Sequence, residues 1–160
     1  MPVTFNIRHL EDKGLHLQGQ IDAKELEIEG LDEVIHARKP LNYDLHVEKM
    51  EKAMLAHGRL DLPLDCECVR CLKRLEHRLL LPDWAAHLPL EGEEQVKVSN
   101  DVVDLTPYIR EDIVLAFPQH PLCKPDCKGL ENPRKDSAAG VQHESELTSS
   151  AWSELNKLKF

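Results

Sequence analysis

The chain has five cysteines, in two clusters that lie about fifty residues apart. The first cluster is Cys66, Cys68 and Cys71, and the second is Cys123 and Cys127. Each cluster contains one short-spaced pair, Cys68 with Cys71 and Cys123 with Cys127, and such a pair delivers two sulfurs from one tight turn to one metal ion. Two pairs complete a tetrahedral thiolate site. The sequence therefore predicts a structural zinc ion held by these four cysteines, which joins two distant parts of the chain.

Cys66 is left outside this set. It is separated from Cys68 by a single residue, which is too close for comfortable binding of one ion by both. On an alternating strand it shares a face with Leu60, Leu62 and Leu64. We therefore expect Cys66 to occupy a core position.

Two alternatives to the four-cysteine site stay open. His120 lies three residues before Cys123 and could replace a thiolate. It ranks below Cys127, because Pro121 follows it directly and Asp126 favours a turn around Cys127. Cysteine is also often a plain buried apolar residue, but the charged residues that surround both clusters favour a metal site.

Basic residues accompany the cysteines in an otherwise acidic chain. The formal net charge of −9 argues against a general nucleic-acid binder, whose affinity comes from neutralising phosphates with lysine and arginine. If a metal site joins the two clusters, their cations converge on one patch, which either contacts RNA or another partner or only offsets the thiolate charge. The candidate contact residues are Arg70, Lys73, Arg74, Lys124 and Lys128.

The chain shows no sign of export or of membrane insertion. Its opening residues, MPVTFNIRHLEDKG, contain no apolar stretch of the signal-peptide type, and no purely aliphatic run in the chain exceeds four residues. We therefore expect a cytoplasmic protein without a membrane partner. Thiols stay reduced in that compartment, so the cysteines are expected to bind metal or to be free rather than to form disulfides.

Hydrophobic alternation predicts an antiparallel sheet. Residues alternate between apolar and polar in five segments, 3–7, 15–19, 41–47, 60–66 and 74–81. Gly14 suggests that the first two segments form a hairpin, and the first cysteine cluster lies at the tip of another between 60–66 and 74–81. Residues 82–100, which contain prolines and an acidic cluster, are expected to form a loop over the sheet.

One helix is predicted from about Leu105 to Ala116, with Asp104 or Thr106 as its cap and Pro107 in its first turn. The predicted fold is thus an α+β domain over residues 1–130, an antiparallel sheet that can curl into a partial barrel, with this helix packed on it. Few apolar residues occur in 131–150, which predicts a flexible linker, and the apolar spacing in 151–160 predicts a short C-terminal helix.

Several segments together resemble the YceD-type large ribosomal RNA subunit accumulation proteins. They are LDCECVRCLKRLEHRL, DLTPYIREDIVLAFPQHPLCKPDCKGL and the terminal SSAWSELNKLK. The resemblance covers about residues 55–160. It equates Cys68 and Cys71 with the first cysteine pair of that family, and Cys123 and Cys127 with its second cluster.

The resemblance implies a bacterial cytoplasmic factor without enzymatic activity, which supports synthesis, processing or stability of the large-subunit (23S) rRNA. Its implied partner is precursor RNA, a ribosomal protein or another biogenesis factor. No small-molecule substrate is evident from the sequence.

The sequence disfavours two other classes of function. A redox dithiol at Cys68 and Cys71 would use neighbouring cations to lower a thiol pKa, but such motifs belong in a strand-to-helix turn, and the residues after Cys71 read as a strand. A zinc hydrolase or deaminase is disfavoured, because HExxH is missing and no His-x-Glu of the deaminase type lies beside the cysteines. GxSxG and a glycine-rich phosphate loop are missing as well.

Overall fold

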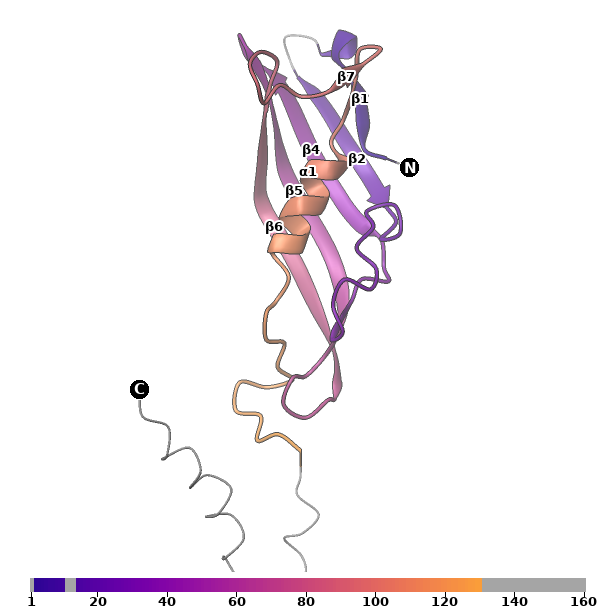
Figure 1. The fold of residues 1–160 in the computed structure, drawn as a ribbon, viewed down its shortest axis with the longest axis vertical. Coiled ribbons are helices and arrows are strands. Elements are labelled where there is room, and N and C mark those ends of the chain that lie inside the picture. Colours follow the sequence, from indigo (N-terminus) through magenta and orange to yellow (C-terminus); the bar gives the residue numbers. More distant parts are fainter. Residues whose placement is uncertain (1, 11–13, 131–160) are drawn as a thin grey trace, which may run out of the picture. The chain divides into compact units, whose positions relative to one another are not determined.

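The computed structural model describes residues 2–10 and 14–130 (Figure 1). Residues 1–130 form one compact unit. The linker predicted for 131–150 and the helix predicted for 151–160 lie outside the described residues. In chain order the elements are β1 (Thr4–Asn6), the 3-10 helix η1 (Ile7–His9), β2 (Leu15–Ile21), β3 (Ile35–His36), β4 (Leu41–Lys49), β5 (Ala53–Glu67), β6 (Arg74–Pro89), β7 (Val98–Ser99), β8 (Val102–Asp104) and α1 (Thr106–Leu115).

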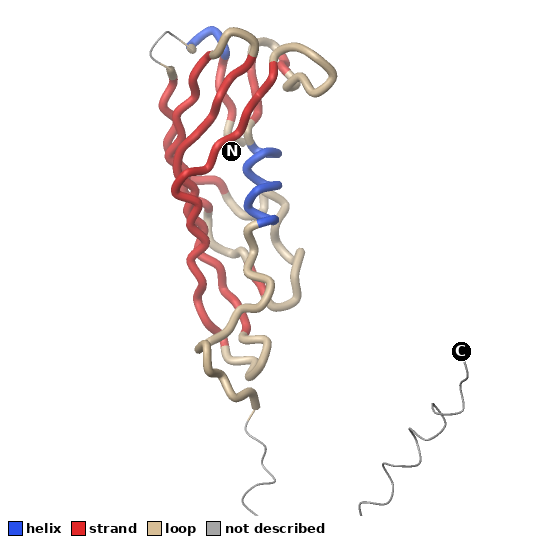
Figure 2. Tube along the Cα trace, turned by 90° about the vertical axis from the view of Figure 1, so that its left-hand side faces the viewer, coloured by secondary structure: helices blue, strands red, loops and turns tan. Residues whose placement is uncertain are grey.

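Most of the fold is antiparallel β-structure, as the alternation predicts. The larger sheet has the order β2-β4-β5-β3, and β6 pairs with β5 as well. Strand β6 follows β5 from Ala53 to Glu67, so β4 and β3 share the other edge of β5. This sheet is curled, and α1 lies on one of its faces (Figure 2).

The inward face of β5 forms the centre of the core. Leu60, Leu62 and Leu64 are fully buried, and Cys66 continues the same row with 1% of its surface exposed. Burying a leucine side chain contributes about 1.5–3 kcal/mol, so this row is a large source of stability. The core position expected for Cys66 is confirmed.

Helix α1 runs from Thr106 to Leu115, within one residue of the prediction at each end. Its N-cap residue is Leu105 rather than either predicted cap, although the Asp104 carboxylate accepts the Thr106 amide at 2.8 Å. Ile109 and Ile113 are buried in the same apolar cluster as the strands. Among the described residues no helix is long and apolar enough to cross a membrane.

The predicted N-terminal hairpin is wrong. Strand β1 pairs with β8, with Phe5 opposite Val103, whereas β2 pairs with β4, with Leu17 opposite Leu45. The chain leaves β1 through η1, where the Asn6 side chain accepts the Arg8 amide at 2.8 Å. Alternation marks a strand but carries no information about its partner, and here the partner lies about a hundred residues away.

The loop expected over 82–100 is also wrong, because β6 continues to Pro89. Two of its residues, Pro82 and Asp83, stand opposite the single residue Arg59 of β5, which makes a β-bulge. Leu79 is buried from an odd-numbered position and Trp84 from an even-numbered one, so the alternation breaks at the bulge. A proline is tolerated there because the outer edge of β6 pairs with no other strand of the described chain.

A hairpin that begins in this region, formed by β7 and β8, was also missed. Strands β7 and β8 are joined by a two-residue turn, with Ser99 opposite Val102. Asn100 and Asp101 in that turn both have positive φ, 51° and 63°, as a type I′ hairpin turn requires. Together with β1 these strands form a separate three-stranded sheet, in the order β1-β8-β7.

Gly58 lets β4 approach β5 closely. A Cβ atom at this position would overlap the carbonyl oxygen of Asp44 and lie 2.9 Å from the Cα atom of Leu45. We expect Gly58→Ala to lower the free energy of unfolding by about 3 kcal/mol or more, because the β4 backbone would have to move. Urea unfolding measures this change.

Gly30→Ala is the matched control. Gly30 has a φ of 71°, but nothing lies within 4 Å of a Cβ built there, so only the backbone conformation opposes the substitution. We expect a loss of about 1 kcal/mol. Equal losses for the two variants would contradict the close approach at Gly58.

Candidate metal centre

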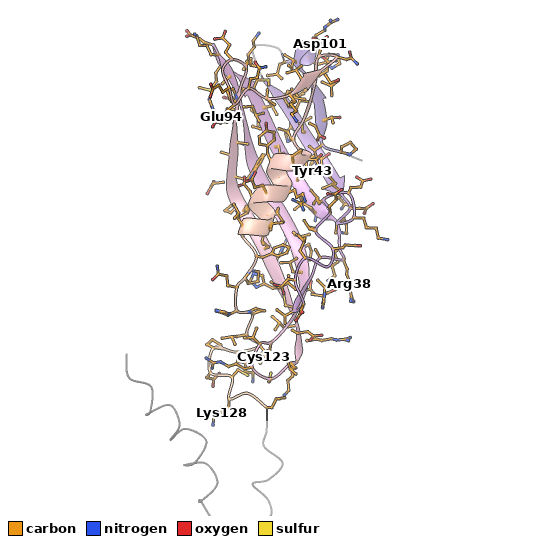
Figure 3. All side chains as sticks on the ribbon, in the orientation of Figure 1. Arg38, Tyr43, Glu94, Asp101, Cys123 and Lys128 are labelled. Atoms are coloured by element: carbon orange, nitrogen blue, oxygen red, sulfur yellow. The ribbon has the colours of Figure 1, made fainter. Side chains whose placement is uncertain are left out.

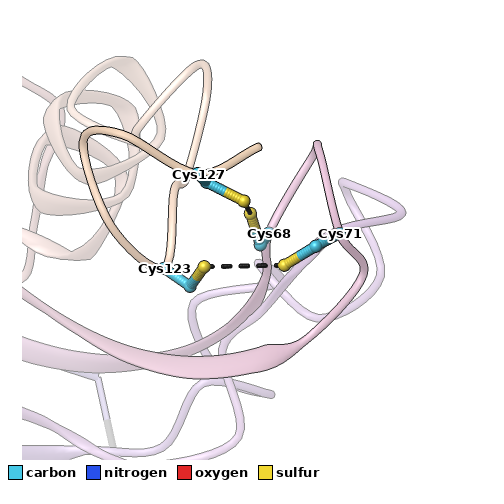
Figure 4. Close-up of side chains that lie close together, drawn as sticks. All are labelled: Cys68, Cys71, Cys123 and Cys127. Carbon is cyan, nitrogen blue, oxygen red and sulfur yellow. Dashed lines mark hydrogen bonds between the residues drawn. The ribbon is translucent and has the colours of Figure 1, made fainter. Parts of the chain in front are cut away.

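The first cysteine pair occupies the turn between β5 and β6. Cys68 follows the last residue of β5, and Cys71 precedes the first residue of β6 by three positions. The Cys68 amide donates to the carbonyl of Lys73, and the Leu72 amide donates to the carbonyl of Cys68, both at 2.9 Å. These bonds hold the turn closed, so both sulfurs are presented by one short segment (Figure 4).

The second pair lies in the segment that follows α1. The Cys127 amide donates to the carbonyl of Lys124 at 3.1 Å, which makes a turn between Cys123 and Cys127. Two hydrogen bonds connect this segment to the first turn: the Val69 amide donates to the carbonyl of Pro121 at 3.0 Å, and the Arg70 guanidinium donates to the carbonyl of Cys127 at 2.9 Å. The polypeptide itself therefore brings the two pairs together.

The four sulfurs have the spacing of a tetrahedral metal site. The Sγ atoms of Cys68 and Cys127 are 3.8 Å apart, those of Cys71 and Cys123 are 3.5 Å apart, and all four lie within 4.8 Å of one another (Figure 4). A tetrahedron with metal–sulfur bonds of about 2.3 Å has edges of about 3.8 Å. The four cysteines that form the two short-spaced pairs in the sequence could thus hold one metal ion.

The electrostatics of the four thiols also suit a cation. Several hydrogen bonds, the most effective of them from the Cys123 backbone, together lower the pKa of Cys68 to about 6, so one thiolate forms readily. The neighbouring sulfur of Cys71, together with burial, raises the pKa of Cys123 to about 12. Once one thiolate has formed, its negative charge disfavours deprotonation of the neighbouring thiols. A bound cation would offset this repulsion, because metal binding and thiol deprotonation are coupled.

Cys66 and His120 do not join the four sulfurs. Cys66 lies opposite both Ile35 and Leu75 within the sheet, and burial raises the pKa of its thiol. His120 is exposed, and among the described residues the group that could hold a metal ion contains only Cys68, Cys71, Cys123 and Cys127.

The five predicted contact residues are exposed around this centre, and Figure 3 shows Lys128 close to Cys123. Arg70 differs from the others, since its guanidinium donates to the Cys127 carbonyl and so helps to build the site. The remaining four make no ion pair within the part of the chain that the structure describes; they are Lys73, Arg74, Lys124 and Lys128. Only Glu67 and Asp126 are acidic between 66 and 74 and between 120 and 130, so this end of the unit is locally basic.

Sequence reasoning missed an apolar component of the same surface. Val69 and Leu72 in the first cysteine turn are 41% and 58% exposed. Leu72 also has a φ of 59°, a left-handed conformation that costs a residue other than glycine about 1–2 kcal/mol. Nothing in the sequence marks this residue, because leucine rarely adopts the conformation.

The chain is similar in sequence to uncharacterized proteins of mycobacteria. An uncharacterized protein of Mycobacterium tuberculosis strain H37Rv is 33% identical over 98 residues, which cover 56% of this chain and 47% of that protein. An uncharacterized protein of Mycobacterium leprae is 30% identical over 139 residues, which cover 81% of this chain and 64% of that protein. The chain thus spans about half to two thirds of the length of these relatives. No solved structure matches it.

A family match covers the larger part of the chain. Residues 56–159 match the family described as large ribosomal RNA subunit accumulation protein YceD. The matched segment includes most of β5, all of β6 and α1, and both cysteine pairs. This chain belongs to the YceD family of large ribosomal RNA subunit accumulation proteins.

Proposed function

We propose that this protein is a non-enzymatic factor that supports synthesis, processing or stability of the 23S rRNA in the bacterial cytoplasm. The observation that carries the proposal is the family match, whose description names accumulation of the large ribosomal RNA subunit. A binding role also agrees with the cysteine centre, since four thiolates around one ion leave no open position for a reacting water.

Zinc is the metal that we propose for this centre. Four cysteine thiolates in tetrahedral arrangement are a common ligand set for structural zinc, and the sulfur spacing given above supports it. The proposed ion would hold the turn between β5 and β6 against the segment that follows α1. It would therefore shape the basic surface rather than take part in a reaction.

The proposed RNA contact is limited to the basic cysteine end. Phosphate binding needs cations, and with a net charge of −9 the rest of the chain is acidic on balance. Lys73, Arg74, Lys124 and Lys128, which form no ion pair among the described residues, supply exposed cations there. The acidic remainder suits a different partner, such as a basic ribosomal or biogenesis protein.

A thiol redox function at Cys68 and Cys71 is the competing proposal, and the lowered pKa of Cys68 favours it. Against it, the pair lies in a β-hairpin turn rather than at the start of a helix. Tight metal binding by the reduced protein, without measurable exchange with a disulfide reagent, would exclude this alternative.

We expect the purified, reduced protein to contain one zinc ion per chain. Cys68→Ser should lose the ion, because three thiolates no longer close the tetrahedron. Cys66→Ser and His120→Ala should both retain it, since neither residue belongs to the group of four sulfurs that lie within 4.8 Å of one another. Metal analysis by mass spectrometry decides between these outcomes. A folded, fully reduced, metal-free wild-type protein would refute the zinc proposal.

Removal of the metal should destabilise the fold. The ion would connect Cys71 and Cys123, which are 52 residues apart, and a cross-link that closes a loop of this length contributes about 4 kcal/mol. We expect a chelator to lower the Tm by more than about 10 °C. The metal-free Cys68→Ser variant is the control, and its Tm should not respond to the chelator.

Deletion of the gene should reduce mature large ribosomal subunits relative to small ones, as measured on sucrose gradients. Rescue should fail for a variant in which Lys73, Arg74, Lys124 and Lys128 are all replaced by glutamate, because repulsion of phosphate replaces attraction. Arg70 stays unchanged in this variant because it helps to build the centre.

The matched control reverses four exposed lysines elsewhere, Lys24, Lys49, Lys52 and Lys97. It carries the same change in net charge and should rescue the deletion. Normal subunit ratios in the deletion strain would contradict the proposed function. Rescue by both variants would contradict only the assigned RNA contact.

A further inference from the structure

A groove lies between the middle of β6 and the C-terminal end of α1. Its walls include Leu81, Asp83 and Trp84 of β6 and Asp112, Leu115 and Ala116 from the end of the helix, and its volume is about 480 Å³. Figure 1 shows α1 beside β6 at this position. The Trp84 indole nitrogen donates to the Asp112 carboxylate at 2.7 Å, which fixes the two walls relative to each other.

We propose that this groove binds a protein segment that carries a lysine or arginine beside apolar side chains. This inference rests on the proposed function, because the segment would belong to a protein partner of the proposed rRNA factor. The groove supplies both an apolar surface and negative charge, and β6 and α1 contribute residues to each.

Leu115 supplies the apolar surface. It is 77% exposed, more than any other large apolar side chain in the described part of the chain. It ends a helix whose Ile109 and Ile113 are fully buried. Covering this exposed leucine and the half-buried Leu81 with an apolar side chain of a partner would be favourable, because it removes apolar surface from water.

The negative charge comes from Asp83, Asp112 and the end of the helix. Asp83 is exposed and forms no ion pair within residues 2–10 and 14–130. The last turn of α1 contains no basic residue, so no side chain of that turn offsets the partial negative charge of the helix C-terminus. A lysine or arginine is the side chain that complements this set, and an RNA phosphate would be repelled by it.

The same features disfavour a second copy of this chain as the occupant. No strand among the described residues pairs with the outer edge of β6, but Pro82 lacks an amide hydrogen and the bulge bends the strand at the groove, and both oppose strand addition there. Two copies would also bring Asp83 of each chain close to that of the other, on molecules with a net charge of −9. A basic segment held by its side chains avoids both obstacles.

Fluorescence anisotropy with the full-length protein tests the proposal. The probe is a labelled ten-residue peptide of alternating lysine and valine, and the comparison peptide has glutamate in place of lysine. We expect binding of the lysine peptide only. Asp83→Lys and Leu115→Ser should each weaken that binding by about tenfold or more, because one removes the charge and the other the apolar contact.

Two matched variants control for general effects. Glu29→Lys makes the same charge change on an exposed loop, and Leu31→Ser removes another exposed leucine, which is 49% exposed. Each should change the dissociation constant by less than about twofold. Circular dichroism melting curves check that all four variants fold.

Three outcomes would overturn the inference. The lysine peptide does not bind below millimolar concentration, or Glu29→Lys weakens its binding as much as Asp83→Lys, or sedimentation shows a dimer that Leu115→Ser dissociates. None of them depends on the ribosome profile of the deletion strain, so this inference and the proposed function can fail separately.

Discussion

Strand β5 is the element on which the other parts of the structure depend. It forms hydrogen-bonded pairs with β4 and β3 on one edge and with β6 on the other, and its leucine row lies at the centre of the core. The same row continues through Cys66 to Cys68, both of them buried. The cysteine centre is thus an extension of the core strand, and the position of the first cysteine pair follows from the pairing of β5 with β6.

The sequence predicted the parts of the fold that have a local signal. Alternation located β4, the second half of β5 and the first half of β6, because each has one buried face, and the apolar spacing located α1 to within one residue at each end. The cysteine spacing grouped four residues from two distant segments, and the structure brings those four sulfurs within 4.8 Å of one another. This success has a physical reason, since a metal site restricts its ligands to a few short spacings.

Other parts depend on contacts that have no local signal. The pairing of β1 with β8 joins strands that lie about a hundred residues apart in the sequence, and no pattern within either strand specifies it. Arg70 looks like one of several surface cations in the sequence, yet its bond to the Cys127 carbonyl connects the two cysteine turns. The groove at Leu115 was also missed, because its acidic and apolar residues come from β6 and α1, which are brought together only by folding.

The bulge in β6 has a consequence for how the length of this chain can vary among relatives. The extra residue at 82–83 separates two halves of the strand, and in each half the apolar side chains face the core. Leu81 lies opposite Leu60, and Trp84 lies opposite Gly58. Loss of one residue at this point would leave a regular strand in which Trp84 still faces inward. A single insertion or deletion elsewhere in β6 would invert the faces of the residues beyond it. Position 82–83 is therefore where natural indels in this hairpin are expected to accumulate.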